Sequence, residues 1–160
     1  MSSKEHKEKI WNYIKDAPVG MLTTMDGQDM RARPMHIVQD EYDGTLWFFT
    51  KRSADKVFET DTGAGVCVTF SDQDSGIYVS LTGNATLTQN KALIDKFWSP
   101  FAGAWFEKGK DDPEVALLEI KISKGEHWEA DENKIVQLYE IAKANLTDDT
   151  PDIGENQKFG

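Results

Sequence analysis

The sequence has 160 residues, 39% of them hydrophobic, and a formal net charge of −10 at pH 7. This length and apolar fraction suit one folded domain and exclude a disordered chain, while the acidic balance excludes non-specific nucleic-acid binding, which needs a basic face. A single cysteine, no apolar run near the roughly 20 residues of a membrane helix and no signal-peptide core lead us to expect a soluble cytoplasmic protein without a disulfide.

The first half of the chain alternates one helical pattern with several short strands. Residues 2–17 form an amphipathic pattern that starts at a capping box and ends at a proline. Strand patterns then follow at 19–25, 30–39 and 45–50, with short turns between them. Residues 53–61 predict a short helix with Ser53 at its N-cap.

The second half continues the same mixture. Strands are predicted at 64–72, 77–89 and 114–130, the last interrupted at Gly125, and helices at 90–98 and 133–146. Residues 147–160 are polar and predict a flexible C-terminal tail. We therefore expect one domain, residues 1–146, of mainly β class (β+α), in which about six antiparallel strands close into a small barrel with peripheral helices.

The segment "TLWFFTKRSADK", residues 45–56, is the most informative stretch. Strand alternation places Leu46 and Phe48 on one face, and Trp47 and Phe49 on the other. Both faces are apolar, so one should meet the core. The other should meet a second subunit or a flat ligand.

Cations and hydroxyls follow these aromatics directly, namely Thr50, Lys51, Arg52, Ser53 and Lys56. A helix that begins at Ser53 would gather free backbone N–H groups beside these side chains, which is a suitable site for a phosphate. A capped helix with solvated lysines is the alternative interpretation.

The neighbouring strand pattern "MRARPMHI" supports the phosphate interpretation. All three arginines of the chain lie between residues 31 and 52, although the protein is acidic overall. Pro34 cannot donate a hydrogen bond to a sheet and so predicts an edge strand or a bulge. Arg33 would then lie beside an anion site.

In this order, "RARPM", "LWFFT", "SADK", "YVSLTGNA" and the tryptophan of "GEHWEA" resemble the flavin-binding split-barrel superfamily related to pyridoxamine 5′-phosphate oxidase. The resemblance covers roughly residues 5–145 and is closest to the bacterial general stress protein branch. It implies a six-stranded antiparallel split β-barrel and a homodimer with flavin mononucleotide (FMN) at the subunit interface; flavin adenine dinucleotide (FAD) is the alternative cofactor.

The resemblance also implies which residues hold the flavin. Arg33, Pro34 and Met35 would lie along the ring, Phe49 and Thr50 in the ribityl and phosphate region, and Ser53 and Lys56 at the phosphate. Ser80, Trp98 and Trp128 are the implied contributors from the partner subunit. The implied activity is an oxidoreductase that uses NAD(P)H-reduced flavin on a small acceptor, in a stress response.

The departures from the family limit this activity. No arginine follows Arg52, whereas the oxidases bind their substrate partly through a C-terminal arginine motif, so oxidation of pyridoxamine 5′-phosphate is not expected. A non-catalytic flavin-buffering stress protein, or a haem or deazaflavin binder, is the alternative function. We can name no catalytic acid or base, and the histidines lack metal-ligand spacing with Cys67. Trp98 and Trp105 are seven residues apart, which fits helix-face packing, a dimer contact or a ligand lid, and Trp105 is interpreted as a packing residue.

Overall fold

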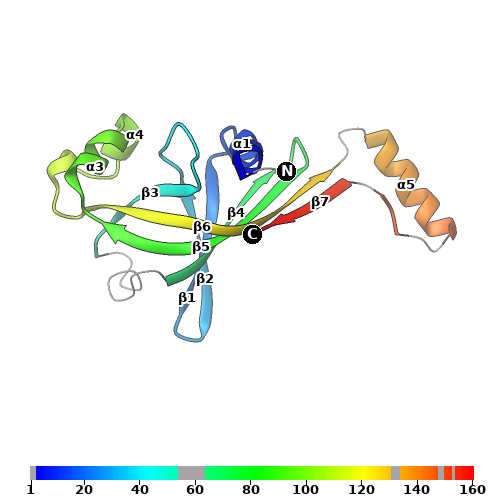
Figure 1. Cartoon of the computed structure of the whole chain (residues 1–160), viewed down its shortest axis with the longest axis horizontal. Helices are drawn as coiled ribbons and strands as arrows, with labels where there is room; N and C mark the ends of the chain where they lie inside the picture. Colours follow the sequence, from blue (N-terminus) through cyan, green and yellow to red (C-terminus); the bar gives the residue numbers. More distant parts are fainter. Residues whose placement is uncertain (1–2, 54–63, 131–133, 148–149, 153) are drawn as a thin grey trace.

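The computed structural model describes residues 3–53, 64–130, 134–147, 150–152 and 154–160 (Figure 1). Its helices are α1 (Ser3–Ile14), α3 (Lys91–Phe97), α4 (Pro100–Gly103) and α5 (Lys134–Thr147), with a 3₁₀ turn, η1 (Gly109–Asp111). Its strands are β1 (Val19–Asp26), β2 (Asp29–His36), β3 (Thr45–Lys51), β4 (Ala64–Asp72), β5 (Ile77–Thr88), β6 (Val115–Ala130) and β7 (Gly154–Phe159). The predicted mainly β class is confirmed. The helix predicted over 53–61 lies outside the described residues, except for Ser53.

The strands form one seven-stranded antiparallel sheet, in which six follow the order β2-β1-β4-β5-β6-β3 and β7 pairs with β6 beside this path. The two edge strands approach each other after β2 ends, where Ile37 bridges to Phe48 and the Val38 N–H donates to the Trp47 carbonyl at 3.1 Å. The sheet therefore curls toward a barrel, and in the described part of the chain its edges join along this short stretch alone. A sheet that is closed along only part of its edges is consistent with the expected split barrel.

The C-terminal segment corrects one prediction. Residues 154–159 form β7, which pairs with β6 from Gly154 opposite Ala130 to Phe159 opposite Gly125. The predicted flexible tail is therefore wrong for these residues. Phe159 explains the difference, because its ring packs over Gly125, where a Cβ atom would lie 2.3 Å from that ring. Gly125 thus permits this close contact, and β6 continues through it without the predicted interruption.

The main core lies inside the curled sheet and under α1. Leu46 and Phe48 of β3 are completely buried there, together with Leu22, Leu81 and other aliphatic side chains. Ile10 and Ile14 of α1 close one side of this core. The prediction that one face of β3 meets the core is confirmed.

A second, smaller core covers the other face of β3. Trp47 packs on Phe97 of α3 with the ring centroids 5.2 Å apart, and Phe49 meets the edges of Trp98 and Phe106 at 5.5 and 6.3 Å. This cluster lies at the end of the molecule that carries α3 and α4 (Figure 1). The second apolar face of β3 is therefore partly covered by its own chain.

His127 of β6 is buried in the main body of the protein, with only 2% of its surface exposed. Its ring lies 5.2 Å from that of Tyr13. Burial lowers the pKa of His127, and the charge of Lys9 lowers it further; Gln157, Glu129 and Glu155 act in the opposite direction without outweighing them.

This lowered pKa predicts that acid destabilises the fold. The folded state binds fewer protons than the unfolded state, in which a histidine has a pKa of about 6.5. The contribution to stability is therefore complete above about pH 6.5 and is lost as the pH falls from there through the folded-state pKa. Thermal unfolding between pH 8 and pH 5 should show a falling midpoint, with a smaller fall in His127→Gln. Equal pH dependence in the two proteins would exclude His127 as the cause.

Candidate functional site

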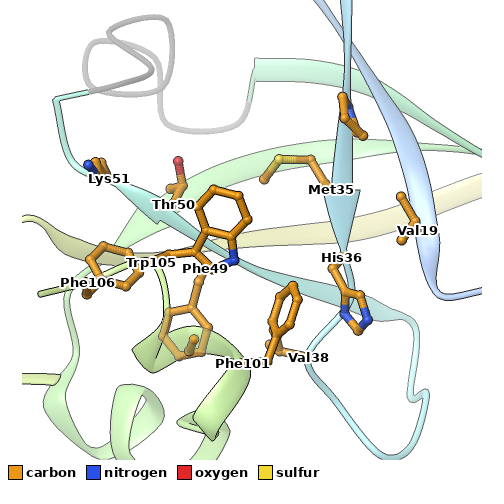
Figure 2. Close-up of a pocket in the computed structure, with 12 residues that line it drawn as sticks. Val19, Met35, His36, Val38, Phe49, Thr50, Lys51, Phe101, Trp105 and Phe106 are labelled. Carbon is orange, nitrogen blue, oxygen red and sulfur yellow. The ribbon is translucent and has the colours of Figure 1, made fainter. Parts of the chain in front are cut away.

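A cleft of about 450 Å³ opens between β2, β3 and the segment that contains α4. Figure 2 shows the side chains of Met35, Thr50 and Trp105 gathered around this space, with Phe101 facing His36. Most of the wall is apolar or aromatic, and Thr50 and Lys51 form one end. The lining residues are Val19, Pro34, Met35, His36, Val38, Phe49, Thr50, Lys51, Phe101, Ala102, Trp105 and Phe106.

Strand β3 places the aromatic wall and the polar end next to each other. Because side chains alternate along a strand, Phe48 points into the main core while Phe49 points toward the cleft. Thr50 and Lys51, the last two residues of β3, also line the cleft and form its polar end. The order of residues in this one strand therefore sets the polarity of the cleft along its length.

Strand β2 supplies the opposite wall. It is an edge strand of the sheet, which is one of the two positions that Pro34 predicts, because a proline without an N–H is tolerated there. Pro34 and Met35 both line the cleft. His36 follows, with its Nδ1 at 2.6 Å from the Ile37 carbonyl oxygen and its ring 4.6 Å from the ring of Phe101.

Arg33 differs from its neighbours because it does not line the cleft. Its guanidinium donates to the hydroxyl oxygen of Thr24 on β1 at 2.5 Å, and Thr24 is buried. In the sheet register Arg33 lies opposite Leu22, a core residue. This arginine therefore points to the inner side of the sheet, and its predicted contact with a flavin ring stays a prediction.

Ser53 lies just beyond β3, and its donors already hold an anionic group. Its N–H donates to Glu114 Oε2 at 3.2 Å, and its hydroxyl donates to the same oxygen. These two hydrogen bonds, with the nearby charge of Arg52, lower the pKa of Glu114. Ser53 is thus oriented as a double donor to a carboxylate. Lys56, its predicted companion, lies outside the described residues.

The remaining predicted residues lie away from the cleft of their own chain. Ser80 is on the outer face of β5, beside Cys67, with the oxygen and sulfur 3.4 Å apart. Trp128 of β6 is 39% exposed and lines a separate cleft of about 350 Å³ with Tyr78. Trp98 packs behind Phe49 in the second core. The structure therefore brings together Pro34, Met35, Phe49 and Thr50, with Ser53 next to them in the chain.

The structure adds residues that the sequence interpretation missed. Trp105 is 68% exposed and lines the cleft, so its interpretation as a packing residue is wrong. Phe101 is half-exposed on the same wall. The sequence signal that could have indicated these residues is the Ser99–Pro100 pair, which is typical of a helix start. In the structure a new helix, α4, begins there, and the Ser99 hydroxyl accepts the Ala102 N–H at 3.3 Å.

Among the residues that the structure describes, no group of three or more histidine, cysteine, aspartate and glutamate side chains could hold a metal ion. Within the same residues, every helix is too short or too polar to cross a lipid bilayer.

Comparison with known proteins places this architecture. Residues 5–152 match the family described as pyridoxamine 5′-phosphate oxidase like. The chain belongs to this family. Among the curated members, general stress protein 26 of Bacillus subtilis is 28% identical over 124 residues, which are 76% of this chain and 86% of that protein.

Solved structures of the pyridoxamine 5′-phosphate oxidase-like family agree with this assignment. A crystal structure from Jannaschia sp. CCS1, classed as a general stress protein 26, is 34% identical over 98% of both chains, with a TM-score of 0.74. The general stress FMN/FAD binding protein of Xanthomonas citri is 30% identical, covers 79% of this chain and 90% of its own, and has a TM-score of 0.70. The predicted family and its general stress protein branch are confirmed.

Proposed function

We propose that this protein binds FMN in the cleft between β2 and β3. The observation that carries the proposal is the composition of that cleft, an aromatic and apolar space of about 450 Å³ that ends in Thr50 and Lys51, with Arg52 and Ser53 following directly in the chain. A flavin ring is a large flat apolar body that suits the first part. A phosphate with up to about two negative charges suits the second.

The residues present fit this cofactor. Pro34 and Met35 on one wall and Phe49 on the other would hold the ring, and Thr50 would lie along the ribityl chain. Ser53 can donate from both its N–H and its hydroxyl, and it does so to a carboxylate. A related protein from Xanthomonas citri is described as binding FMN or FAD, which supports a flavin and leaves FAD as the alternative.

We further propose a homodimer in which a second copy covers the outer face of the sheet. Val19, Met21, Met25 and Met30 on β1 and β2 are between 41% and 76% exposed, and Tyr78 and Trp128 are exposed on β5 and β6. Exposed apolar side chains gathered on one sheet face are typical of a protein interface.

Ser80 lies within this apolar face. Met21 is opposite Thr69, and Thr69 is opposite Ser80, so these three residues form one row across β1, β4 and β5. Ser80 and Trp128 therefore lie where a second copy would contact them. This position supports the proposal that these two residues reach the flavin of the partner subunit. Size-exclusion chromatography with light scattering would give a dimer; a monomer that still binds FMN tightly would contradict the shared site.

A bound flavin supplies hydride and electron transfer, so we propose an FMN-dependent oxidoreductase that takes hydride from NAD(P)H, in the cytoplasm and in a stress response. The chain's own residues bind the ring, orient it through the phosphate end and exclude water with Phe101, Trp105 and Phe106. A non-catalytic flavin-buffering protein is the second candidate. It is favoured by the described part of the cleft wall, on which two lining residues, His36 and Lys51, are titratable.

The absorbance spectrum of the purified protein, titrated with FMN and then mixed with NADH or NADPH, tests these functions in turn. We expect flavin bands to shift on binding and to bleach with a reduced nicotinamide. Flavin binding without bleaching would favour the buffering protein. A haem or deazaflavin spectrum of the purified protein would identify a different cofactor and overturn the FMN proposal. The absence of any spectral shift when flavin is added would contradict the proposal as well.

Ser53→Ala should weaken FMN by roughly ten-fold, because a hydrogen bond to a charged group contributes about 1.5–3 kcal/mol and this position is exposed to solvent. Riboflavin, which has no phosphate, should bind the variant and the wild type equally well. Isothermal titration with both ligands measures the two affinities. Equal weakening of FMN and riboflavin would remove Ser53 from the phosphate site.

A further inference from the structure

Glu114 occupies the donors that the proposed phosphate needs. Its Oε2 atom accepts both the Ser53 N–H and the Ser53 hydroxyl. Ser53 and Glu114 are 61 residues apart, and the contact joins the end of β3 to the residue before β6. Two donors from one residue converging on one anionic oxygen is also the way a protein binds a phosphate oxygen.

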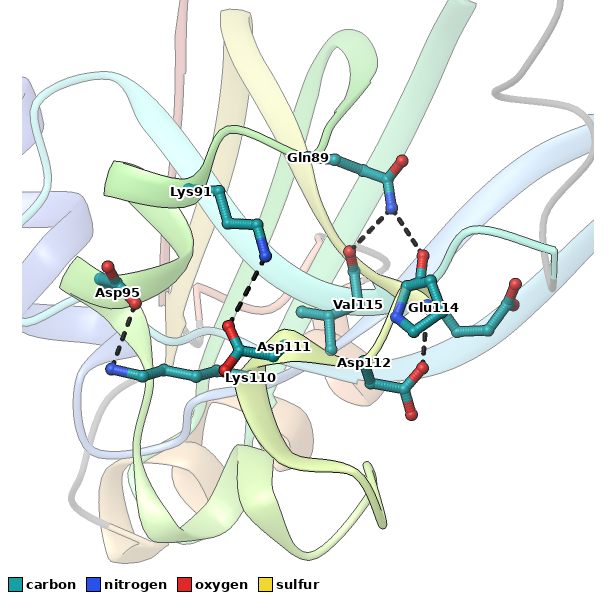
Figure 3. A network of polar contacts seen from close by, with 9 residues as sticks. Gln89, Lys91, Asp95, Lys110, Asp111, Asp112, Glu114 and Val115 are labelled. Atoms are coloured by element: carbon teal, nitrogen blue, oxygen red, sulfur yellow. Dashed lines mark hydrogen bonds and ion pairs between the residues drawn. The ribbon is translucent and has the colours of Figure 1, made fainter.

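The backbone around Glu114 is fixed from several sides. Gln89 donates to the carbonyl oxygens on either side of it, at 2.8 Å to Pro113 and 3.1 Å to Val115. The Glu114 N–H donates to Asp112 Oδ1 at 2.9 Å, and its own carbonyl accepts the Arg52 N–H at 2.8 Å. Figure 3 shows the Glu114 side chain extending away from the contacts of Gln89 and Asp112. The main chain therefore holds this carboxylate at Ser53, and release needs rotation of the side chain alone.

We propose that Glu114 is a specificity-determining residue, which competes with the ligand's phosphate for Ser53 and so sets how strongly the site prefers phosphorylated over unphosphorylated flavin. This inference rests on the proposed function of the cleft. The two donors of Ser53 cannot serve both anions at full strength, so a phosphate must displace the carboxylate. The displaced carboxylate stays nearby because its main chain is fixed, and its charge then repels the phosphate. Riboflavin has no phosphate, so its binding neither displaces the Glu114 carboxylate nor is opposed by its charge.

Glu114→Gln keeps the shape of the side chain and removes its charge, and Glu114→Ala removes the acceptor atoms as well. Both variants should bind FMN more tightly than the wild type, by roughly ten-fold for Glu114→Ala at low salt, and should bind riboflavin unchanged. Asp111→Asn is the matched control. It removes the same charge from the same loop, but from a carboxylate that pairs with Lys91 at 3.6 Å. This control should leave the preference for FMN within about two-fold of the wild type.

Combining Glu114→Gln with Ser53→Ala tests the mechanism, since the gain in FMN affinity should disappear when the contested donor is absent. Unchanged FMN affinity in both Glu114 variants, an equal gain for riboflavin, or an equal gain in Asp111→Asn would overturn the proposal while leaving flavin binding intact. A wild type that binds neither FMN nor riboflavin would instead overturn the proposed function, and this inference with it.

Discussion

Replacing Phe48 with alanine should lower the free energy of unfolding by about 3–5 kcal/mol, which is the range for removing a large aromatic side chain from a core. Phe48 is completely buried between the curled sheet and the rest of the main core. It also forms the bridge to Ile37 that joins the two edges of the sheet. Domains of this size are stable by about 5–15 kcal/mol, so this one change removes a large fraction of the total.

Urea denaturation, followed by circular dichroism, measures this effect. Phe48→Leu is the matched control, because it keeps an apolar side chain and should lose clearly less stability than Phe48→Ala. If Phe48→Ala lost less than about 1 kcal/mol, the position of Phe48 at the centre of the core would be wrong.

Replacing Phe49 with alanine should weaken both FMN and riboflavin about ten-fold or more, and by the same factor, because the change removes an aromatic wall from the ring site. The phosphate end of the cleft is untouched by this change, so the ratio of the two affinities should stay constant. This pattern is the opposite of the one expected for Ser53→Ala. Fluorescence titration with the two ligands, under the same salt conditions, separates the two patterns.

Trp47→Leu is the control for Phe49→Ala. Trp47 lies on the same face of β3 and packs in the same second core, against Phe97, but it does not line the cleft. Its replacement should lower stability and leave flavin affinity nearly unchanged. If Trp47→Leu weakened flavin as much as Phe49→Ala does, the loss would come from the second core as a whole and not from a wall of the ring site.

The sequence predicted those features that local patterns determine. Alternation along residues 45–51 predicted that Phe48 and Phe49 lie on opposite faces of the strand, one of them meeting the core. This is confirmed, with Phe48 in the main core and Phe49 at the cleft. Pro34 predicted an edge strand or a bulge, and β2 is an edge strand. In each case the deciding physics acts within a few residues of the chain, through strand geometry or through the missing N–H of proline.

Features that depend on distant residues were not predictable in this way. The spacing of Trp98 and Trp105 suggested a shared helix face. However, α3 ends at Phe97 and α4 starts at Pro100, so the two tryptophans do not belong to one continuous helix. The strand β7 is mostly polar. Its one apolar side chain, Phe159, packs over Gly125, which is distant in the sequence, so local patterns do not predict this contact. Nothing in the local sequence indicates that Glu114 reaches Ser53.

A crystal structure of the protein with FMN would decide whether the cleft between β2 and β3 is the flavin site. We expect the ring between Pro34, Met35 and Phe49, with the phosphate on the N–H and hydroxyl of Ser53 and with Glu114 rotated away. A flavin bound elsewhere, or a structure in FMN-saturated solution that leaves this cleft empty and Glu114 still on Ser53, would contradict this expectation.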